Sequence, residues 1–376
     1  IGVVGGGGNA VNHMYHQGIG GVSFVLCNTD AQALRNSPVP VKVQLGAKGE
    51  GAGNIPEVAK KLAEESAAEV EALFDDNTRM AFITAGMGGG TGTGAAPVVV
   101  RIAKEKGVLT VGIVTIPFLF EGEPKILQAF AGVEEMRKHV DALLVINNER
   151  LCKIYPDLSW TTAFAKADDS LSNAARSIAE LVSKDGKINL DFADVRTTLK
   201  DGGAAVISTG SGEGEHRMSR AIQNALTSPL LKESDIYGAE RVLFNLYFSP
   251  EEGEELRMQE SKELSEFMLR FKKKVNVIWG YTHDSSLGKA VKITILATGF
   301  EVSDLTLKGE YGGDADEHIA QSQYIVLKPD QLDDNDLLEK LDKTPAYDRP
   351  KDFSDNFDGS EKKEESNGSG RRTIRF

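Results

Sequence analysis

One glycine-rich run constrains what this chain can fold into more than any other feature: Gly86-Met87-Gly88-Gly89-Gly90-Thr91-Gly92-Thr93-Gly94. The run follows the apolar segment Met80–Ala85 and precedes a helical pattern with Pro97 near its start. Glycine lets a backbone close around an anion, and a helix N-terminus adds free amides and a favourable dipole. The pattern therefore predicts a strand, a phosphate-binding loop and a helix. The sequence contains no G-x-x-x-x-G-K-[ST], which excludes a lysine-based P-loop.

A second glycine segment, Gly5-Gly6-Gly7-Gly8-Asn9, lies between the apolar residues Gly2–Val4 and a helical pattern. Alone it also fits a dinucleotide site, because Asn28-Thr29-Asp30 ends the next predicted strand about 20 residues later, where a ribose-binding acid would lie. A dinucleotide-dependent oxidoreductase is therefore one alternative. Two glycine loops at the carboxyl ends of strands in one sheet can instead enclose a polyphosphate from two sides, whereas a dinucleotide fold needs one.

Short apolar runs alternate with helical patterns in the first half of the chain, which predicts a doubly wound parallel sheet in an α/β domain. We expect strands at Gly2–Val4, Val22–Cys27, Met80–Ala85, Leu109–Thr115 and Ala142–Asn147, and helices at Asn9–His16, Ile55–Phe74, Gly94–Lys106 and Lys125–His139.

A long helix is predicted from Trp160 to about Ser183, because apolar residues recur there at three- and four-residue spacing. At 1.5 Å per residue it would span about 35 Å, the width of a domain. Beyond it, strand-like segments at Ala204–Thr209, Val242–Phe248, Val275–Trp279 and Val291–Ala297, with helices at His216–Leu226 and Glu260–Lys272, predict a second, smaller α/β domain with a mixed sheet. The predicted units are a nucleotide-binding domain (1–159), the central helix (160–185), a C-terminal domain (186–302), an acidic flexible linker (303–370) and a basic tip (371–376).

The charge of the chain is concentrated near its end. The whole chain carries 43 Lys and Arg against 56 Asp and Glu, a net charge of −13, which argues against nucleic acid as a partner. Between Ser303 and Gly370, 18 of the residues are acidic and 8 basic. No apolar run approaches the roughly 20 residues of a membrane span, so we expect no direct membrane insertion. With two cysteines, Cys27 and Cys152, a disulfide framework is not expected and the cytoplasm is the natural compartment.

Three motifs together resemble the tubulin/FtsZ family of GTPases. The run from Gly88 to Gly94 is similar to the family's glycine motif, which is highly specific. Asn28-Thr29-Asp30-Ala31-Gln32-Ala33-Leu34 and Asn189-Leu190-Asp191-Phe192-Ala193-Asp194-Val195 look like FtsZ rather than eukaryotic tubulin. The resemblance covers about residues 1–300 in unbroken order. It implies a tubulin-like fold and a bacterial cell-division GTPase that forms filaments in a ring at mid-cell.

The resemblance implies where GTP or GDP, with Mg²⁺, would bind. Glu121 would contact the ribose, as would Lys125, which stands where the family usually has arginine. Phe164 would lie on the base, and Asp168, one helical turn away, would accept from the N1–H and 2-amino groups of guanine. The full set of expected nucleotide-binding residues is Gly5, Gly6, Gly7, Gly8, Asn9, Asn28, Gly53, Gly88, Gly89, Gly90, Thr91, Gly92, Thr93, Gly94, Glu121, Lys125, Phe164 and Asp168. No histidine pattern predicts a metal site made by the protein alone.

Asp191 and Asp194 lie beyond the far end of the predicted long helix, whereas Asp168 lies near its start. About 17 helical residues, roughly 25 Å, separate Asp168 from that far end. If both aspartates act in hydrolysis, they act on the nucleotide of a neighbouring subunit, and the repeated head-to-tail contact makes a filament. This agrees with the mechanism that the resemblance implies, with Asn189 orienting the loop or the water. Solvated carboxylates in a connecting segment, and a nucleotide-binding regulator that does not polymerise, are the alternatives.

Some residues depart from the family's pattern. Gly51-Ala52-Gly53-Asn54 resembles a loop that senses the γ-phosphate, but Glu50 stands before it where an apolar residue is usual, and Val4 replaces a common glycine. The chain ends in Gly370-Arg371-Arg372-Thr373-Ile374-Arg375-Phe376. In the family a C-terminal peptide binds membrane-linked adaptor proteins, which this tip resembles loosely. The alternative is a solubilising tail without a specific partner.

Overall fold

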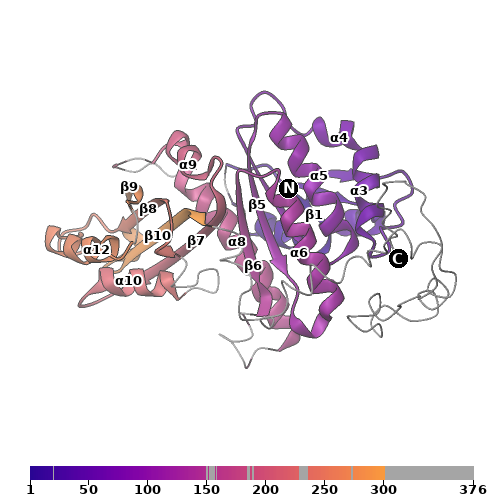
Figure 1. Cartoon of the computed structure of the whole chain (residues 1–376). Coiled ribbons are helices and arrows are strands. Elements are labelled where there is room, and N and C mark those ends of the chain that lie inside the picture. Colours follow the sequence, from indigo (N-terminus) through magenta and orange to yellow (C-terminus); the bar gives the residue numbers. More distant parts are fainter. Residues whose placement is uncertain are drawn as a thin grey trace, which may run out of the picture. The chain divides into compact units, whose positions relative to one another are not determined.

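The computed structural model describes residues 1–19, 21–149, 151, 157, 159–183, 187–188, 190–227, 236–271 and 274–300, without the side chains of residues 160, 161, 182, 183 and 300. All of these residues belong to one of two compact units, Ile1–Leu307. Its strands form one ten-stranded sheet in the order β3-β2-β1-β4-β5-β6-β7-β10-β8-β9 (Figure 1). The predicted α/β class with a mixed sheet is confirmed. Cys152, the linker and the tip lie outside the described residues.

The first six strands are parallel and lie next to one another. They are β1 (Gly2–Val3), β2 (Val25–Asn28), β3 (Val41–Gln44), β4 (Met80–Gly86), β5 (Leu109–Ile116) and β6 (Ala142–Asn147). The remaining strands are β7 (Gly203–Gly212), β8 (Arg241–Phe248), β9 (Asn276–His283) and β10 (Val291–Phe300). β10 is antiparallel to both β7 and β8, whereas β8 and β9 are parallel. β6 meets β7 through only two residue pairs, Ala142 with Gly203 and Leu143 with Ala204.

Helices connect these strands. They are α1 (Val4–His16), α2 (Ala31–Asn36), α3 (Pro56–Glu65), α4 (Ala67–Glu71), α5 (Gly90–Glu105), α6 (Glu123–Arg137), α8 (Trp160–Ser183), α9 (Phe192–Leu199), α10 (Arg217–Leu226) and α12 (Ser261–Met268). Short 3-10 turns lie at η1 (Leu119–Glu121), η2 (Met258–Glu260) and η3 (Ser285–Leu287). No helix in the described part of the chain is long and apolar enough to cross a bilayer.

A loop was predicted for the first glycine segment, but this prediction is wrong. The segment lies within the first two turns of α1. The strand before it ends at Val3, and the helix begins at Val4, whose φ is +65°. A Cβ on Gly7 would lie 2.2 Å from the carbonyl oxygen of Thr84, so the helix can approach β4 this closely only with glycine there. The Thr84 hydroxyl donates to the Gly7 carbonyl at 3.1 Å. This close packing outweighs the usual cost of glycine in a helix.

The predicted helix over Ile55–Phe74 is two helices, because Ser66 interrupts it. Ser66 has a φ of −102° and a ψ of +21°, and its hydroxyl accepts from the Gly46 amide at 2.9 Å. Conversely, α5 begins at Gly90, four residues earlier than predicted, so the second glycine loop is short. The prediction also missed β3, α2 and α9, which are short.

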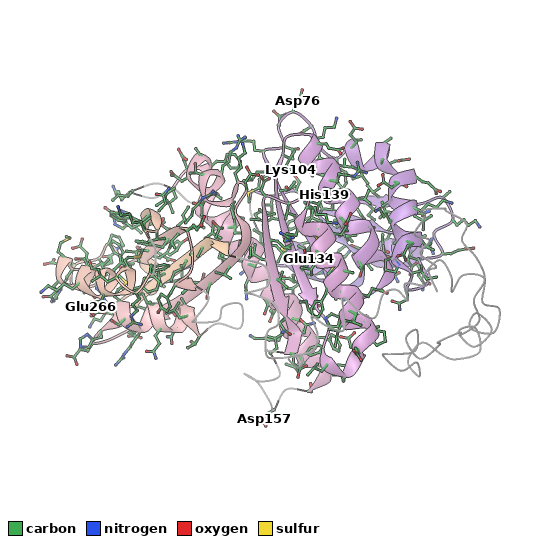
Figure 2. All side chains as sticks on the ribbon, in the orientation of Figure 1. Asp76, Lys104, Glu134, His139, Asp157 and Glu266 are labelled. Carbon is green, nitrogen blue, oxygen red and sulfur yellow. The ribbon has the colours of Figure 1, made fainter. Side chains whose placement is uncertain are left out.

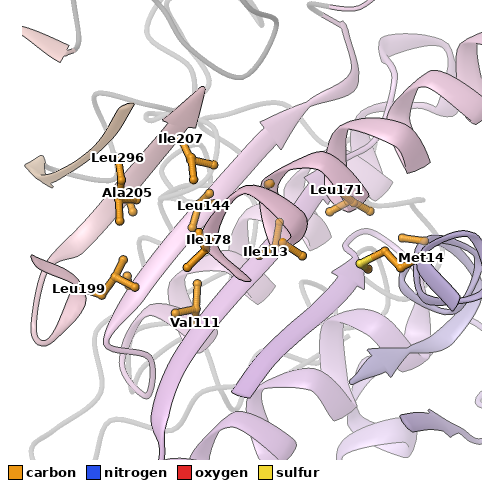
Figure 3. Close-up of a cluster of buried hydrophobic side chains, with 14 of the residues drawn as sticks. Met14, Val111, Ile113, Leu144, Leu171, Ile178, Leu199, Ala205, Ile207 and Leu296 are labelled. Atoms are coloured by element: carbon orange, nitrogen blue, oxygen red, sulfur yellow. The ribbon is translucent and has the colours of Figure 1, made fainter. Parts of the chain in front are cut away.

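The central helix α8 has the predicted bounds and packs on the sheet. Figure 3 shows Leu171 and Ile178 of α8 beside Val111, Ile113 and Leu144 of β5 and β6. All five side chains are buried and belong to one apolar cluster that continues into β7 and β10. Because α8 covers strands of the first half and of the second, it links the two parts of the sheet.

Candidate functional site

Three glycine segments meet at the carboxyl ends of the first strands. The start of α1 follows β1, and residues 87–89 follow β4, the neighbouring strand. A Cβ on Gly6 would contact the Cα of Gly86 at 3.6 Å, so the two segments touch. The third segment, 51–54, lies against the start of α5, because a Cβ on Gly90 would be 2.7 Å from the Ile55 nitrogen. The predicted convergence of the glycine segments at one sheet edge is therefore present.

Most glycines of these three segments fall into two groups by what a side chain would meet. In the first group a Cβ would collide with the protein itself: Gly7, Gly88, Gly90, Gly92 and Gly94 would each have a neighbour within 2.9 Å. In the second group a Cβ would have no neighbour within 4 Å: Gly5, Gly51, Gly53 and Gly89. Gly8 has one distant contact, at 3.8 Å. The first group lets backbones pack closely, whereas the second leaves open space beside bare backbone.

Part of this open space is a pocket between α1 and β2. Gly5, Gly8 and Asn9 of α1 line one side, and Asn28 lies with Cys27 at the end of β2 on the other. The Asn28 side chain accepts from the Asp30 amide at 3.1 Å, which fixes the turn into α2. Backbone free of side chains at a helix N-terminus is suited to a phosphate group. Burial raises the pKa of the Cys27 thiol to about 12, so this cysteine behaves as a small apolar residue.

The two predicted threonines are buried and already hydrogen-bonded within the protein. The Thr91 hydroxyl lies 2.7 Å from that of Thr29, and the Thr93 hydroxyl accepts from the Gly88 amide at 2.9 Å. These bonds tie the second glycine loop to the end of β2 and to its own helix. The hydroxyls therefore hold the loop in shape, and each keeps a lone pair that could accept a further bond.

Phe164 lies in a small aromatic cluster with two residues that the sequence analysis did not assign to the site. Its ring centroid is 5.1 Å from that of Phe118, and Phe118 stacks on Phe120 at 5.2 Å. Phe164 and Phe120 are 44 % and 54 % exposed, which leaves apolar ring surface for a flat ligand. The Phe-x-Phe pattern after β5 is the signal that could have revealed these partners.

Asp168 follows Phe164 by one turn of α8 and is half-buried. Burial, with a smaller contribution from the charge of Asp169, raises the pKa of the Asp168 carboxyl to about 6. Asp169 itself contacts His13 of α1 at 3.0 Å. An ionised Asp168 therefore gains from a ligand that offers it N–H donors, as guanine does.

Glu121 and Lys125 lie close to each other after β5. The Lys125 ammonium is 3.4 Å from one oxygen of Glu121, and the other oxygen accepts from the Phe118 amide at 3.0 Å. Glu121 is thereby fixed next to the aromatic cluster. This geometry places a carboxylate and a cation beside the aromatic rings.

Asp191 and Asp194 cap the start of α9. The Asp194 amide donates to Asp191 at 2.9 Å, and the Asp191 amide donates back to Asp194 at 3.0 Å. Asp191 is exposed and Asp194 half-buried, and each retains lone pairs for another ligand. Asn189 lies outside the described residues. The structure does not bring these aspartates to the glycine segments.

The position of this loop follows from one contact. The guanidinium of Arg79 lies over the ring of Phe192, 3.9 Å from its centroid. Arg79 directly precedes β4, whereas the glycine loop follows the other end of β4. Figure 2 shows Asp76, in the turn before β4, and Asp157, shortly before α8, at opposite ends of the part of the molecule that contains the parallel strands. The loop thus lies at the amino edge of the parallel strands, and the pocket lies at the carboxyl edge.

The residues near the pocket fit Mg²⁺ only as part of a metal–nucleotide complex. No group of three or more His, Cys, Asp or Glu side chains that could hold a metal occurs among the described residues. Mg²⁺ prefers phosphate oxygens and water with one or two protein ligands, so the open glycine segments suit such a complex.

Comparisons with known proteins agree with this geometry. Residues 1–156 match the model of the Tubulin/FtsZ family, GTPase domain, and residues 203–301 match that of the FtsZ family, C-terminal domain. The chain is 52 % identical over 388 residues to cell division protein FtsZ of Porphyromonas gingivalis, an alignment that covers 93 % of this chain and 84 % of that one. The chain belongs to the FtsZ family.

Other FtsZ relatives are more distant. Cell division protein FtsZ of Wigglesworthia glossinidia brevipalpis is 43 % identical, over 80 % of this chain and 78 % of its own length. A solved structure titled as an empty FtsZ dimer from M. jannaschii has a TM-score of 0.71 at 38 % identity, and covers 82 % of this chain and 93 % of that one. A CetZ2 protofilament from Haloferax volcanii, titled as bound to GTPgS, has a TM-score of 0.67 at 20 % identity, with 81 % and 94 % covered, and shows the fold alone. The resemblance to FtsZ is confirmed, and the oxidoreductase alternative is not favoured.

Proposed function

We propose that this chain binds GTP with Mg²⁺, hydrolyses it to GDP and phosphate, and assembles head to tail into filaments of the cell-division ring. Its site would be shared: the glycine segments of one subunit hold the nucleotide, and Asp191 and Asp194 of the next complete it. The observation that carries the proposal is the Arg79–Phe192 contact, which puts the aspartates at the sheet edge opposite the pocket. The FtsZ structure from M. jannaschii, which is a dimer at 38 % identity to this chain, supports the self-association.

Different residues of the pocket would bind the phosphates, the base and the ribose of the nucleotide. The open backbone at Gly5, Gly8, Gly53 and Gly89 would surround the phosphates, with the remaining glycines allowing the close packing that shapes the loops. Phe164 would stack on guanine, with Asp168 accepting from its N1–H and 2-amino groups. The ribose would lie by Glu121 and Lys125. Asp168 would thereby favour GTP over ATP, since adenine lacks that pair of donors.

The carboxylates from the adjacent subunit would orient a water for in-line attack on the γ-phosphate. The water oxygen bonds to phosphorus as the bond to the bridging oxygen of GDP breaks, and the water's protons leave on phosphate or pass to solvent. Bound Mg²⁺ would offset phosphate charge. An ordinary carboxylate is a weak base, so the role of Asp191 and Asp194 is chiefly to position and polarise the water. Asn189 would help to orient the loop or the water.

We place this activity in the cytoplasm at the mid-cell ring. The domain division proposed from the sequence remains our proposal: a GTP-binding part to residue 159, α8 as the link, and a C-terminal part to residue 302. The acidic segment 303–370 would act as a tether. The basic tip, 371–376, would bind membrane-linked division adaptors.

One assay tests the proposal directly. Protein at a series of concentrations is incubated with Mg²⁺ and GTP, GDP or ATP, sedimented, and assayed for phosphate in the same tubes. We expect pelleting with GTP only, and phosphate release per subunit that rises steeply with protein concentration. Hydrolysis that is independent of concentration, without pelleting, would place the whole site in one subunit and overturn the assignment of Asp191 and Asp194. GTP binding without hydrolysis or pelleting would indicate a regulator.

A further inference from the structure

The segment that leads to Asp191 rests on the edge of the sheet. β9 is the last strand in the sheet order and pairs with β8 on one side. On its other side Ile188 forms an isolated antiparallel bridge with Tyr281. The Lys187 amide donates to the Tyr281 carbonyl at 3.0 Å, and the Tyr281 amide donates to the Ile188 carbonyl at 3.1 Å. The backbone is therefore fixed three residues before Asp191.

Gly280 leaves the space in which this segment lies. A Cβ at position 280 would be 2.6 Å from the Ile188 carbonyl oxygen and 2.8 Å from the Cγ of Leu190. Leu190 is buried in the main apolar cluster, so it has little freedom to move aside. The other atom within 3.0 Å is backbone, and the Asn245 Oδ1 atom is farther away, at 3.2 Å. A side chain at position 280 would therefore displace the segment itself.

A displacement there reaches Asp191 because the chain between is short. Only two residues separate Ile188 from Asp191, and Asp191 is bonded to Asp194 in the first turn of α9. The α9 helix is itself held at its end, where the Arg241 guanidinium donates to the Lys200 carbonyl at 2.7 Å. The β9 edge and α9 thus fix the two aspartates from both sides.

We propose that Gly280 is a positioning residue for hydrolysis: it sets where Asp191 and Asp194 meet the nucleotide of the adjacent subunit. The inference rests on the function proposed above for these aspartates. Gly280 is remote from the nucleotide pocket of its own subunit. It would therefore act only through the segment that carries Asp191 and Asp194. Misplacement of reacting groups by about 1 Å can lower a rate about 100-fold.

The test compares Gly280→Ala with Tyr281→Phe in the full chain. Tyr281 uses backbone atoms in the bridge, so Tyr281→Phe is the matched control and keeps the parent turnover. For Gly280→Ala we expect GTP affinity within twofold of the parent and a fall of tenfold or more in phosphate release per pelleted subunit. Turnover within twofold of the parent would overturn the proposal.

A second pair of variants keeps β9 unchanged in case Gly280→Ala fails to fold. Lys187→Pro removes the amide that donates to Tyr281, whereas Lys187→Ala keeps it. We expect a loss of turnover in the first only, and equal turnover in both would overturn the role of the bridge.

Mixing separates a defect in the loop from a defect in the pocket. Gly89→Val would block its own pocket but carry an intact loop. An equimolar mixture of Gly89→Val and Gly280→Ala should release more phosphate than the two variants measured separately, since one supplies the loop and the other the nucleotide. No gain would overturn the proposal. A parent rate that does not depend on concentration would instead overturn the shared site, whatever Gly280→Ala does.

Discussion

The guanidinium of Arg79 lies over the ring of Phe192, with its central carbon 3.9 Å from the ring centroid. Arg79 directly precedes β4, and Phe192 directly follows Asp191. β4 runs from Met80 to Gly86, seven residues or about 23 Å, before the glycine loop begins. The distance from one edge of the sheet to the other thus separates the two parts of the proposed site. A single subunit does not bring both to one phosphate.

Asp191→Asn should separate the capping role of this residue from its charge. Asparagine caps helices about as well as aspartate, so we expect the melting temperature to stay within a few degrees of the parent. GTP affinity should be unchanged, and turnover should fall tenfold or more. Asp191→Ala should in addition lose about 1 kcal/mol of stability with the cap. Thermal melts, equilibrium GTP binding and phosphate release give the three values. An Asp191→Asn protein with parental turnover would contradict the catalytic assignment.

Asp194→Ala should keep GTP affinity and sharply lower turnover, because this side chain lies beside Asp191 and not in the pocket. Equilibrium binding and hydrolysis assays on the same preparation measure both. Equal losses in the two assays would contradict a site divided between subunits.

Asp168→Asn should change stability in a pH-dependent way. The folded state raises the pKa of this carboxyl from 3.8 to about 6, so folding favours its protonated form. The contribution of this raised pKa to the free energy of unfolding is complete below pH 3.8 and is lost as the pH rises through 6. The variant does not titrate there. Without nucleotide, we therefore expect it to gain melting temperature relative to the parent at pH 7.5, with little difference at pH 4. An equal shift at both pH values would contradict the assigned pKa.

Val4→Gly should stabilise the protein. Val4 has a φ of +65°, a conformation in which a β-branched residue is strained and glycine is not. We expect the free energy of unfolding to rise by about 1 kcal/mol. Val3→Gly is the control: Val3 is fully buried with an ordinary extended backbone, so its loss should destabilise. Denaturant titrations measure both, and a loss of stability in Val4→Gly would contradict the strain.

Gly92→Ala and Gly89→Val should fail in different ways. A Cβ at position 92 would lie 2.1 Å from the Gly86 carbonyl oxygen, so Gly92→Ala should lose about 2 kcal/mol or more of stability. Gly89 has open space beside it but caps the start of α5, where glycine is favoured over valine, so Gly89→Val should lose only about 1 kcal/mol of stability and bind GTP at least tenfold more weakly. Melting curves and equilibrium binding distinguish the two. A Gly89→Val protein with parental affinity would place the phosphates elsewhere.

Sequence patterns predicted the long elements well. The bounds of α8 agree because its apolar residues repeat over many turns on a buried face. The first glycine segment was predicted as a loop because glycines let the backbone close around an anion, but the segment forms the start of α1 and packs against Thr84. No local sequence pattern indicates this contact, since Gly7 and Thr84 are 77 positions apart. Likewise the break at Ser66 depends on the distant Gly46 amide.

The sequence proposes the site residues by their type and spacing, but it does not show their contacts. Spacing placed Asp191 and Asp194 beyond the end of α8, and the structure agrees. It could not show that they cap α9, which was missed, or that Phe192 meets Arg79. The partners of Phe164 were missed because their pattern resembles an ordinary apolar strand end. These contacts join elements that only the folded sheet brings together.

The two groups of glycine have a consequence for how this gene would tolerate change. Alleles altered at Gly7 or Gly92 would be selected against because cells contain less folded protein, and a chaperone or lower growth temperature could rescue them. Alleles altered at Gly5 or Gly89 would leave protein abundance normal but would be selected against because the protein binds its nucleotide poorly. Neither a chaperone nor a lower growth temperature would rescue them. Neighbouring glycines of one segment therefore tolerate substitution differently for unrelated reasons, and a survey of variants that recorded abundance alone would overlook the second group.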